Sequence, residues 1–230
     1  MTKKRAGELN MKLIGLAVVL IIGVILFAEN EKENNLPNVL IIGDSISFGY
    51  SEPLKDITKN KVNITLIPEN AGHTENGLSK LESWLGNTNW DVIHFNHGLH
   101  DLKYIENSKT NPPSHQIQVP LEKYKENMKS IVIRLKKTGA RLIFATTTPV
   151  PKGSLPLRLP SDVIKYNAVA LDVMKEHGVN VNDLYTFTVP QLKTIQNPKN
   201  VHFTEEGSKV LAREVARYIL AAVEQKRSTL

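Results

Sequence analysis

A serine and a histidine that lie far apart in the chain have the side chains needed for nucleophilic attack on an acyl group. Ser45 follows an apolar run that ends at Gly43, and His202 precedes a long amphipathic segment. A serine hydroxyl becomes an effective nucleophile when a histidine takes its proton. Two other interpretations stay open: Ser45 suits the N-cap of a helix, and His202 suits a purely structural histidine.

Two further loops carry groups that could stabilise a negative charge. In the stretch 69–73, Gly72 could bring a bare backbone N–H close to a substrate oxygen. The stretch 95–101 offers a glycine, a carboxylate and His100 as a side-chain donor at the end of another apolar run. Ordinary turn formation is the alternative explanation for both loops.

The elements that must position these residues alternate regularly along the chain. This alternation predicts a three-layer α/β/α sandwich with a central parallel sheet of about five strands. Such folds bind ligands at the carboxyl ends of their strands, where Ser45 would lie. The expected strands cover residues 38–43, 61–68, 91–96, 141–148 and 179–182, and the expected helices cover 75–85, 120–138, 161–177 and 204–224. Two irregular stretches, 103–119 and 147–160, are typical of functional loops.

Taken together, these residues resemble the sequence blocks of the SGNH/GDSL hydrolase family. The resemblance covers residues 38–230, the whole globular part, and the blocks occur in the family's order. The four matches are Gly43-Asp44-Ser45 with the first block, Gly72 with the glycine of the second, Gly98-Leu99-His100-Asp101 with the third, and His202 with the histidine of the last.

This resemblance implies the flavodoxin-like fold of the SGNH hydrolases and a role for each matched residue. Ser45 would be the nucleophile and His202 the general base. The oxyanion hole would be formed by the backbone N–H groups of Ser45 and Gly72 and by the side chain of His100. We expect Asp44 and Asp101 to be structural, each bracing a loop by accepting backbone N–H bonds.

Two positions depart from the family pattern. His100 stands where the family usually has asparagine, and a neutral imidazole can still donate one N–H. Lys199 stands where the family has the aspartate that orients the histidine, and loss of that acid can cost about 10⁴ in rate in a serine protease. We expect a backbone carbonyl to orient His202 in a Ser–His dyad, with Asn200 or Asp183 as the other possible orienting groups. A weakened enzyme is a third reading.

The combined pattern predicts a serine esterase that uses no cofactor and no metal. Its expected substrate is a small molecule or glycan that carries a short acyl group, such as acetyl, outside the cytoplasm. A lysophospholipase, an acyl thioesterase and a catalytically weakened carbohydrate-binding protein on the same fold stay open. Metal-dependent hydrolysis by His94, His97 and His100 is disfavoured, because His94 and His97 would face opposite sides of a strand.

Composition and charge exclude several kinds of site and partner and indicate where the protein is located. The 230 residues include no cysteine, which excludes disulfides, thiolate nucleophiles and zinc–cysteine sites. The net charge of +6 comes from scattered cations interleaved with acids, so no nucleic-acid partner is expected. A basic stretch (1–12) precedes an uncharged one (13–28), which is typical of an export signal or membrane anchor. We expect an exported protein, in the periplasm or at the cell surface, with a leader at 1–30, a linker at 31–37 and membrane contact only through 13–28.

Overall fold

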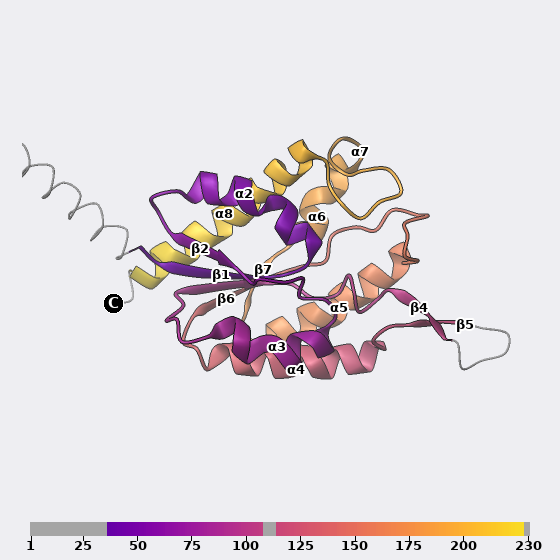
Figure 1. The fold of residues 1–230 in the computed structure, drawn as a ribbon, viewed down its shortest axis with the longest axis horizontal. Coiled ribbons are helices and arrows are strands. Elements are labelled where there is room, and N and C mark those ends of the chain that lie inside the picture. The colour runs from indigo at the N-terminus through magenta and orange to yellow at the C-terminus, as the bar shows by residue number, and fades with distance from the viewer. Residues whose placement is uncertain (1–35, 108–113, 228–230) are drawn as a thin grey trace, which may run out of the picture. The chain divides into compact units, whose positions relative to one another are not determined.

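The computed structural model describes residues 36–107 and 114–227, which from Pro37 onward belong to one compact unit. Its centre is a five-stranded sheet in the order β2-β1-β3-β6-β7, and every neighbouring pair is parallel (Figure 1). The expected five-stranded parallel sheet is therefore confirmed. Its strands are β1 Asn38–Ile42, β2 Asn63–Leu66, β3 Val92–Phe95, β6 Arg141–Ala145 and β7 Asn180–Asn182.

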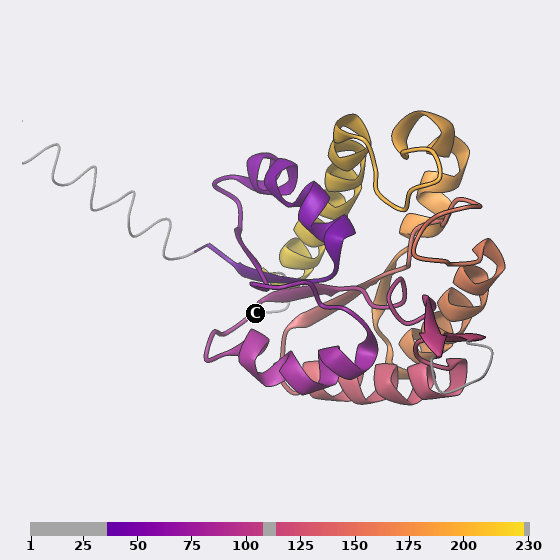
Figure 2. The ribbon, with the colours of Figure 1, turned by 45° about the vertical axis from the view of Figure 1, so that its right-hand side comes forward.

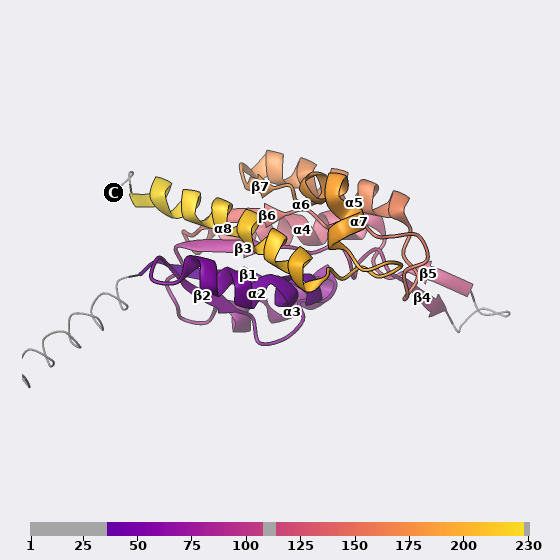
Figure 3. The ribbon, with the colours of Figure 1, turned by 90° about the horizontal axis from the view of Figure 1, so that it is seen from above.

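Helices cover both faces of the sheet and give the three layers expected from the sequence (Figures 2 and 3). One face packs against α3, α4 and α5, and the other packs against α2 and α8, with α6 and α7 beside them. The helices are α2 Ser45–Thr58, α3 Thr74–Leu85, α4 Leu121–Lys136, α5 Pro160–His177, α6 Leu184–Thr188, the short 3₁₀ turn η1 Val189–Gln191, α7 Leu192–Ile195 and α8 Glu205–Arg227.

The continuous apolar run of β1 reflects this double coverage. Successive side chains of a strand point to opposite faces, so a strand with helices on both sides has no polar face. Leu40 and Ile42 join the core that contains α3, α4 and α5, whereas Val39 and Ile41 join the core that contains α2 and α8. All four side chains are at most 2% exposed.

Several segments differ from the expectation. The sequence pattern does not predict α2, because Gly49 and Pro53 interrupt it. The helix forms nonetheless, since Tyr50 and Leu54 are buried in the core shared with α8. The stretch expected to be irregular contains an antiparallel hairpin, β4 Tyr104–Asn107 and β5 Ser114–Ile117. The short helices α6 and α7 are likewise not predicted by the pattern.

The expected strand 141–148 ends three residues early, at Ala145. The backbone N–H of Thr147 donates to the side chain of Asn167, on α5, at 2.9 Å, and Asn167 donates back to the Thr147 carbonyl at 2.8 Å. These bonds take the chain out of the sheet ladder. The β6–α5 loop therefore begins at the sheet edge.

The ends of the unit and its longest loops lie at opposite edges of the sheet. Because all five strands run in one direction, the loops that follow them gather at the carboxyl edge, where the chain reverses its strand order between β1 and β3. At the amino edge, Asp91 accepts from the backbone N–H of Asn38 at 2.8 Å and from Lys226 Nζ at 2.7 Å. One carboxylate thus joins the start of β1 to the last turn of α8.

The predicted leader at 1–30, with its anchor at 13–28, and the linker up to residue 35 lie outside the described residues. Within 36–107 and 114–227, no helix combines the length and the hydropathy needed to span a bilayer. Export and membrane tethering stay predictions.

Candidate active site

Ser45 is the first residue of α2 and lies where β1 turns into the helix. Asp44 caps the helix, because its carboxylate accepts from the backbone N–H of Ile46 at 2.9 Å. This is the structural role expected for Asp44, and it means that Ser45 is not the cap. Gly43 is needed at the turn, since a Cβ there would lie 2.7 Å from Ser47 Oγ. The junction presents the half-buried Ser45 hydroxyl at the carboxyl edge of the sheet.

His202 reaches Ser45 from the loop between α7 and α8. Two backbone bonds close this loop: Asn197 N–H donates to the His202 carbonyl at 3.0 Å, and Thr204 N–H donates to the Ile195 carbonyl at 2.9 Å. The imidazole Nε2 lies 2.8 Å from Ser45 Oγ. Residues 157 positions apart in sequence are therefore at hydrogen-bond distance.

Asn200 contacts the other nitrogen of the same imidazole. Its side-chain oxygen Oδ1 lies 2.8 Å from His202 Nδ1 and accepts from the backbone N–H of His202 at 3.0 Å. A backbone N–H can only donate, so the Asn200 atom that it meets must be the oxygen. That oxygen can only accept, so Nδ1 carries the ring proton and Nε2 is left as the acceptor for the Ser45 hydroxyl.

The other groups considered as orienting residues are placed elsewhere. Asp183 caps α6, where its Oδ1 accepts from Thr146 Oγ1 at 2.8 Å and from the backbone N–H of Thr186 at 3.1 Å. Lys199 is exposed and has a left-handed φ of 54°. Among the described residues, Asn200 is the group that contacts His202 Nδ1, rather than a backbone carbonyl or a carboxylate.

Gly72 lies in the loop between β2 and α3 with a φ of 63°, a left-handed conformation that favours glycine. Its backbone N–H, the expected oxyanion donor, donates to Asn70 Oδ1 at 2.9 Å. Its carbonyl lies 3.2 Å from His97 Nδ1. The loop is therefore held from both sides, and the N–H becomes available to a substrate only when the Asn70 side chain moves away.

His100 lies in the loop after β3 and is partly buried. Burial, together with smaller contributions from the cations Arg158 and Lys103, lowers the pKa of His100 to about 4. The imidazole is therefore neutral at pH 7 and has one N–H to donate. No hydrogen bond joins it to any part of the chain that the structure describes, so this donor is free for a ligand.

Asp101 braces the start of α3, next to the Gly72 loop, by accepting a backbone N–H bond, as expected. Its Oδ1 accepts from the backbone N–H of Thr74 at 2.8 Å and from Thr74 Oγ1 at 2.6 Å. Thr74 is the first residue of α3, so this carboxylate fixes the helix start that follows Gly72. Burial raises the pKa of Asp101, the two Thr74 bonds lower it by less, and the net pKa is about 6.

Arg158 is a charged residue near the site that sequence reasoning missed. It lies in the β6–α5 loop, is only 4% exposed, and donates from Nε to the Leu99 carbonyl at 2.7 Å. Leu99 is the neighbour of His100 and belongs to the third family block. The only signal in the sequence is a single cation within the apolar stretch 155–160, which gives no indication of its partner.

The three histidines considered as metal ligands do not converge. His94 lies 3.3 Å from Asn182 Nδ2 on the α8 side of the sheet, whereas His97 approaches Gly72 on the α3 side. Burial lowers the pKa of both imidazoles to about 4. Among the residues that the structure describes, no three histidine, aspartate or glutamate side chains could hold a metal ion.

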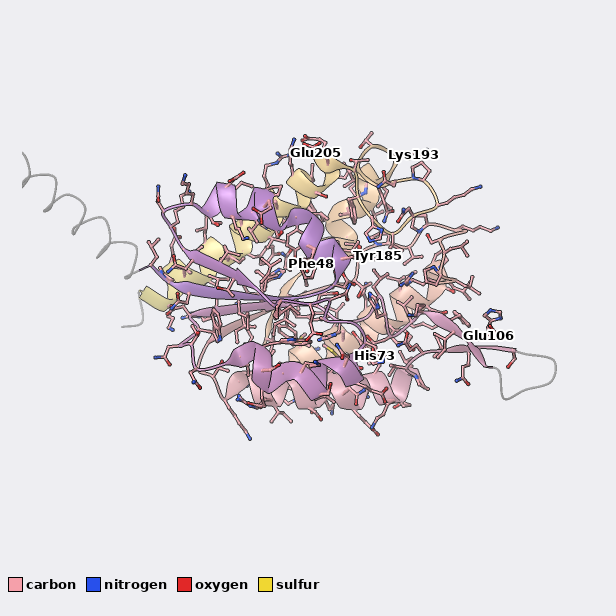
Figure 4. All side chains as sticks on the ribbon, viewed as in Figure 1. Phe48, His73, Glu106, Tyr185, Lys193 and Glu205 are labelled. Carbon is pink, nitrogen blue, oxygen red and sulfur yellow. The ribbon has the colours of Figure 1, made fainter. Side chains whose placement is uncertain are left out.

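A small cavity lies beside Ser45 at the carboxyl edge of the sheet, between α2 and α6. Its volume is about 20 Å³, room for about one water molecule. Phe48 on α2 and Tyr185 on α6 mark the two helices that border it (Figure 4). Its walls include Asp44, Ile46, Asn96, Leu99 and Thr146–Thr148.

A family model and one curated relative match the chain. The model described as GDSL-like lipase/acylhydrolase matches residues 39–215. The GDSL esterase/lipase CPRD49 of Arabidopsis thaliana is 30% identical over 45% of this chain and 46% of its own length. The chain thus spans about half the length of this relative.

Solved structures of similar fold cover most of the chain. A lipase/acylhydrolase from Enterococcus faecalis has a TM-score of 0.68 and 19% identity, over 81% of this chain and 96% of its own. The acetylxylan esterase Axe2 from Geobacillus stearothermophilus has a TM-score of 0.60 and 17% identity, over 79% and 93%. The acetyl xylan esterase AlAXEase has a TM-score of 0.63 and 14% identity, over 79% and 99%. At these identities the likeness concerns the fold.

Proposed function

The chain belongs to the GDSL-like lipase/acylhydrolase family, and from this premise we propose that it is a serine esterase in which Ser45 is the nucleophile and His202 the general base. The observation that carries the proposal is the 2.8 Å contact between Ser45 Oγ and His202 Nε2. The tautomer set by Asn200 leaves the Nε2 lone pair facing the hydroxyl, as proton removal requires.

In the first half of the reaction, Ser45 Oγ attacks the acyl carbonyl carbon while its proton moves to His202 Nε2. The oxyanion that forms accepts from the backbone N–H groups of Ser45 and Gly72 and from the neutral side chain of His100. Asn70 releases the Gly72 N–H as the oxyanion takes its place. The C–O bond to the alcohol then breaks, the alcohol takes the proton from His202, and an acyl ester remains on Ser45.

In the second half, water repeats the same steps. His202 takes a proton from water, the resulting hydroxide attacks the acyl ester, and the oxyanion forms again in the same place. Collapse returns the proton to Ser45 Oγ and releases a carboxylic acid. We assign Asn200 the task that an aspartate performs in most serine hydrolases: it holds the imidazole in one tautomer and one orientation.

We propose a short acyl group, acetyl first, carried by a glycan or small alcohol outside the cytoplasm. The cavity beside Ser45 is too small to enclose a long acyl chain, which favours a short one. The acetylxylan esterases of the same fold make a carbohydrate ester a reasonable substrate for this chain. The basic and apolar leader of the sequence supports export.

The decisive experiment is hydrolysis of 4-nitrophenyl acetate by the full chain, by Ser45→Ala and by Ser79→Ala. Ser79 is an exposed serine of α3 and serves as the matched control. We expect Ser45→Ala to lose about 10⁴-fold or more in kcat/KM, as loss of a serine nucleophile does elsewhere. Retained activity in Ser45→Ala would refute the assignment, and preference for a dodecanoate over the acetate would refute the short acyl group.

A further inference from the structure

Arg158 is a buried cation held by backbone carbonyls rather than by a carboxylate. Besides the Nε bond to Leu99, its Nη1 donates to the Pro156 carbonyl at 3.3 Å. A buried charge is costly to keep unless a group of opposite charge accompanies it. The site thus contains a buried guanidinium that forms no ion pair with a carboxylate of the described residues.

The carboxylate of Asp44, which acts on Arg158 electrostatically, does not supply this ion pair. Asp44 raises the pKa of Arg158, while burial, the larger influence, lowers it. No ion pair joins the two side chains, and Asp44 is already used by the backbone N–H of Ile46. Arg158 Nη2 donates to no acceptor within 36–107 or 114–227, and it is not among the fully buried side-chain atoms that lack a partner. Because the side chain is only 4% exposed, a ligand would meet this fixed guanidinium through Nη2.

Other cations border the same loops without acidic partners. Burial lowers the pKa of Lys103, and the nearby charge of Arg158 lowers it as well. The backbone N–H of Lys103 donates to the His100 carbonyl at 3.4 Å. Lys199 is exposed on the His202 loop, and its side chain lies close to Gly153 of the Arg158 loop. In the described part of the chain, none of these three cations forms an ion pair.

We propose that Arg158, with Lys103 beside it, binds a negatively charged group on the alcohol part of the ester. The inference rests on the proposed function and narrows its substrate class to esters of acidic sugars or other anionic alcohols. The charge belongs on the alcohol because the Asp44 carboxyl lines the cavity offered to the acyl group and would repel an anion there. A planar, fixed guanidinium suits a carboxylate or a phosphate oxyanion.

The test compares two sugars that differ only in charge. Acetylated methyl glucuronoside carries a carboxylate, and acetylated methyl glucuronamide carries a neutral amide of the same shape. We expect the full chain to release acetate from the acid with a kcat/KM about 10-fold higher at low salt, and the ratio to fall as salt screens the attraction. An acetylated methyl glucoside 6-phosphate distinguishes a phosphate from a carboxylate preference.

Arg158→Gln and Lys103→Gln are expected to reduce the acid-to-amide ratio toward one, whereas Arg158→Lys should restore part of it. Lys61→Gln, an exposed lysine at the amino edge, removes the same charge and should leave the ratio unchanged. Equal losses on both sugars in Arg158→Gln would overturn the inference, because they would place Arg158 in support of the Leu99–His100 loop alone. An unchanged ratio in both glutamine variants would also overturn it.

Binding of the deacetylated sugars, measured by calorimetry on the full chain, separates this inference from the proposed function. Preferred binding of methyl glucuronoside that depends on Arg158 supports the anion site even if no ester is hydrolysed. Hydrolysis of 4-nitrophenyl acetate without any preference for the acidic sugar leaves the esterase standing and refutes the anion site.

Discussion

The two halves of the proposed site, one assigned to proton transfer and one to oxyanion stabilisation, differ in how far the protein has assembled them. In the proton-transfer half, Ser45, His202 and Asn200 form a continuous chain of contacts of 2.8 Å each. In the oxyanion half, the N–H of Gly72 donates to Asn70, and the imidazole of His100 forms no hydrogen bond with the described part of the chain. The contacts of the proton-transfer half are formed without substrate, whereas the donors of the oxyanion half gain their acceptor only when substrate binds.

This difference shows which half needs to be rigid. Proton transfer requires the base and nucleophile to be aligned before substrate arrives, and α2 and the closed His202 loop provide that alignment. Oxyanion donors act only on the charge that develops in the transition state. The Gly72 N–H and the His100 side chain can therefore lie on loops, even though the Gly72 N–H is paired with Asn70 before substrate binds. Asp101 and Arg158 keep these loops in place.

Among variants that keep both Ser45 and His202, the largest expected effect comes from removing the side-chain donor of the oxyanion half. Because the pKa of His100 is lowered to about 4, the residue acts as a neutral donor at every pH above about 5. We expect His100→Ala to lose about 10²- to 10³-fold in kcat, the usual cost of one oxyanion donor. His100→Asn, which keeps an N–H donor, should stay within about 10-fold of the parent. Steady-state kinetics with 4-nitrophenyl acetate measures both, and an active His100→Ala would remove His100 from the oxyanion hole.

Variants of Asn200 test whether the proton-transfer half needs a group that orients His202. Asn200→Ala leaves the tautomer and orientation of His202 unset, and we expect a loss of about 10²-fold, at the low end of what a general base contributes. Asn200→Asp keeps the acceptor and adds a charge that stabilises the imidazolium. The acid limb of its kcat/KM profile should therefore move to higher pH. An Asn200→Ala enzyme with parental rate and profile would show that His202 needs no orienting group.

Asp101 tests the support beneath the oxyanion half through pH. Its pKa of about 6 lies above the ordinary value of 3.8, so between these values the folded state binds more protons than the unfolded state. Stability from this group is present at low pH and is lost as pH rises toward about 6, by up to about 3 kcal/mol. Urea unfolding of the parent and of Asp101→Asn, from pH 4 to 7, should show this slope only in the parent. Parallel stability curves would contradict it.

The smallest expected effect concerns the pairing of the oxyanion donor. A neutral hydrogen bond contributes about 0.5–1.5 kcal/mol, so freeing the Gly72 N–H in Asn70→Ala should raise kcat by about 2- to 10-fold. Asn70→Asp, which accepts more strongly, should lower kcat. If Asn70→Ala is slower than the parent, the Asn70 bond shapes the loop rather than occupying the donor.

The sequence predicted the sheet and the two distant residues at its edge because both follow from local pattern. Alternating strands and helices determine the layers, and the parallel direction of the strands brings Ser45 and His202 to one edge. The sequence offered Asn200 as one possible orienting group but favoured a backbone carbonyl, because the Asn200 contact depends on a turn in which Lys199 adopts a φ of 54°, a feature that no periodicity reveals. Arg158 was missed because its structural role depends on a hydrogen bond to the Leu99 carbonyl, 59 positions away in the sequence.

Two segments near the ends of the compact unit meet at Asp91. This fold is therefore suited to circular permutation, in which the old ends are joined and new ends are opened elsewhere. Asn38 and Lys226 bind the same carboxylate, so a short linker could join residues near them without crossing the site. New ends could then be opened in an exposed turn, such as the one at Gly86, to give a circular permutant. The same geometry lets a support or a fused protein be attached near Asn38 or Lys226 while the carboxyl edge of the sheet remains open.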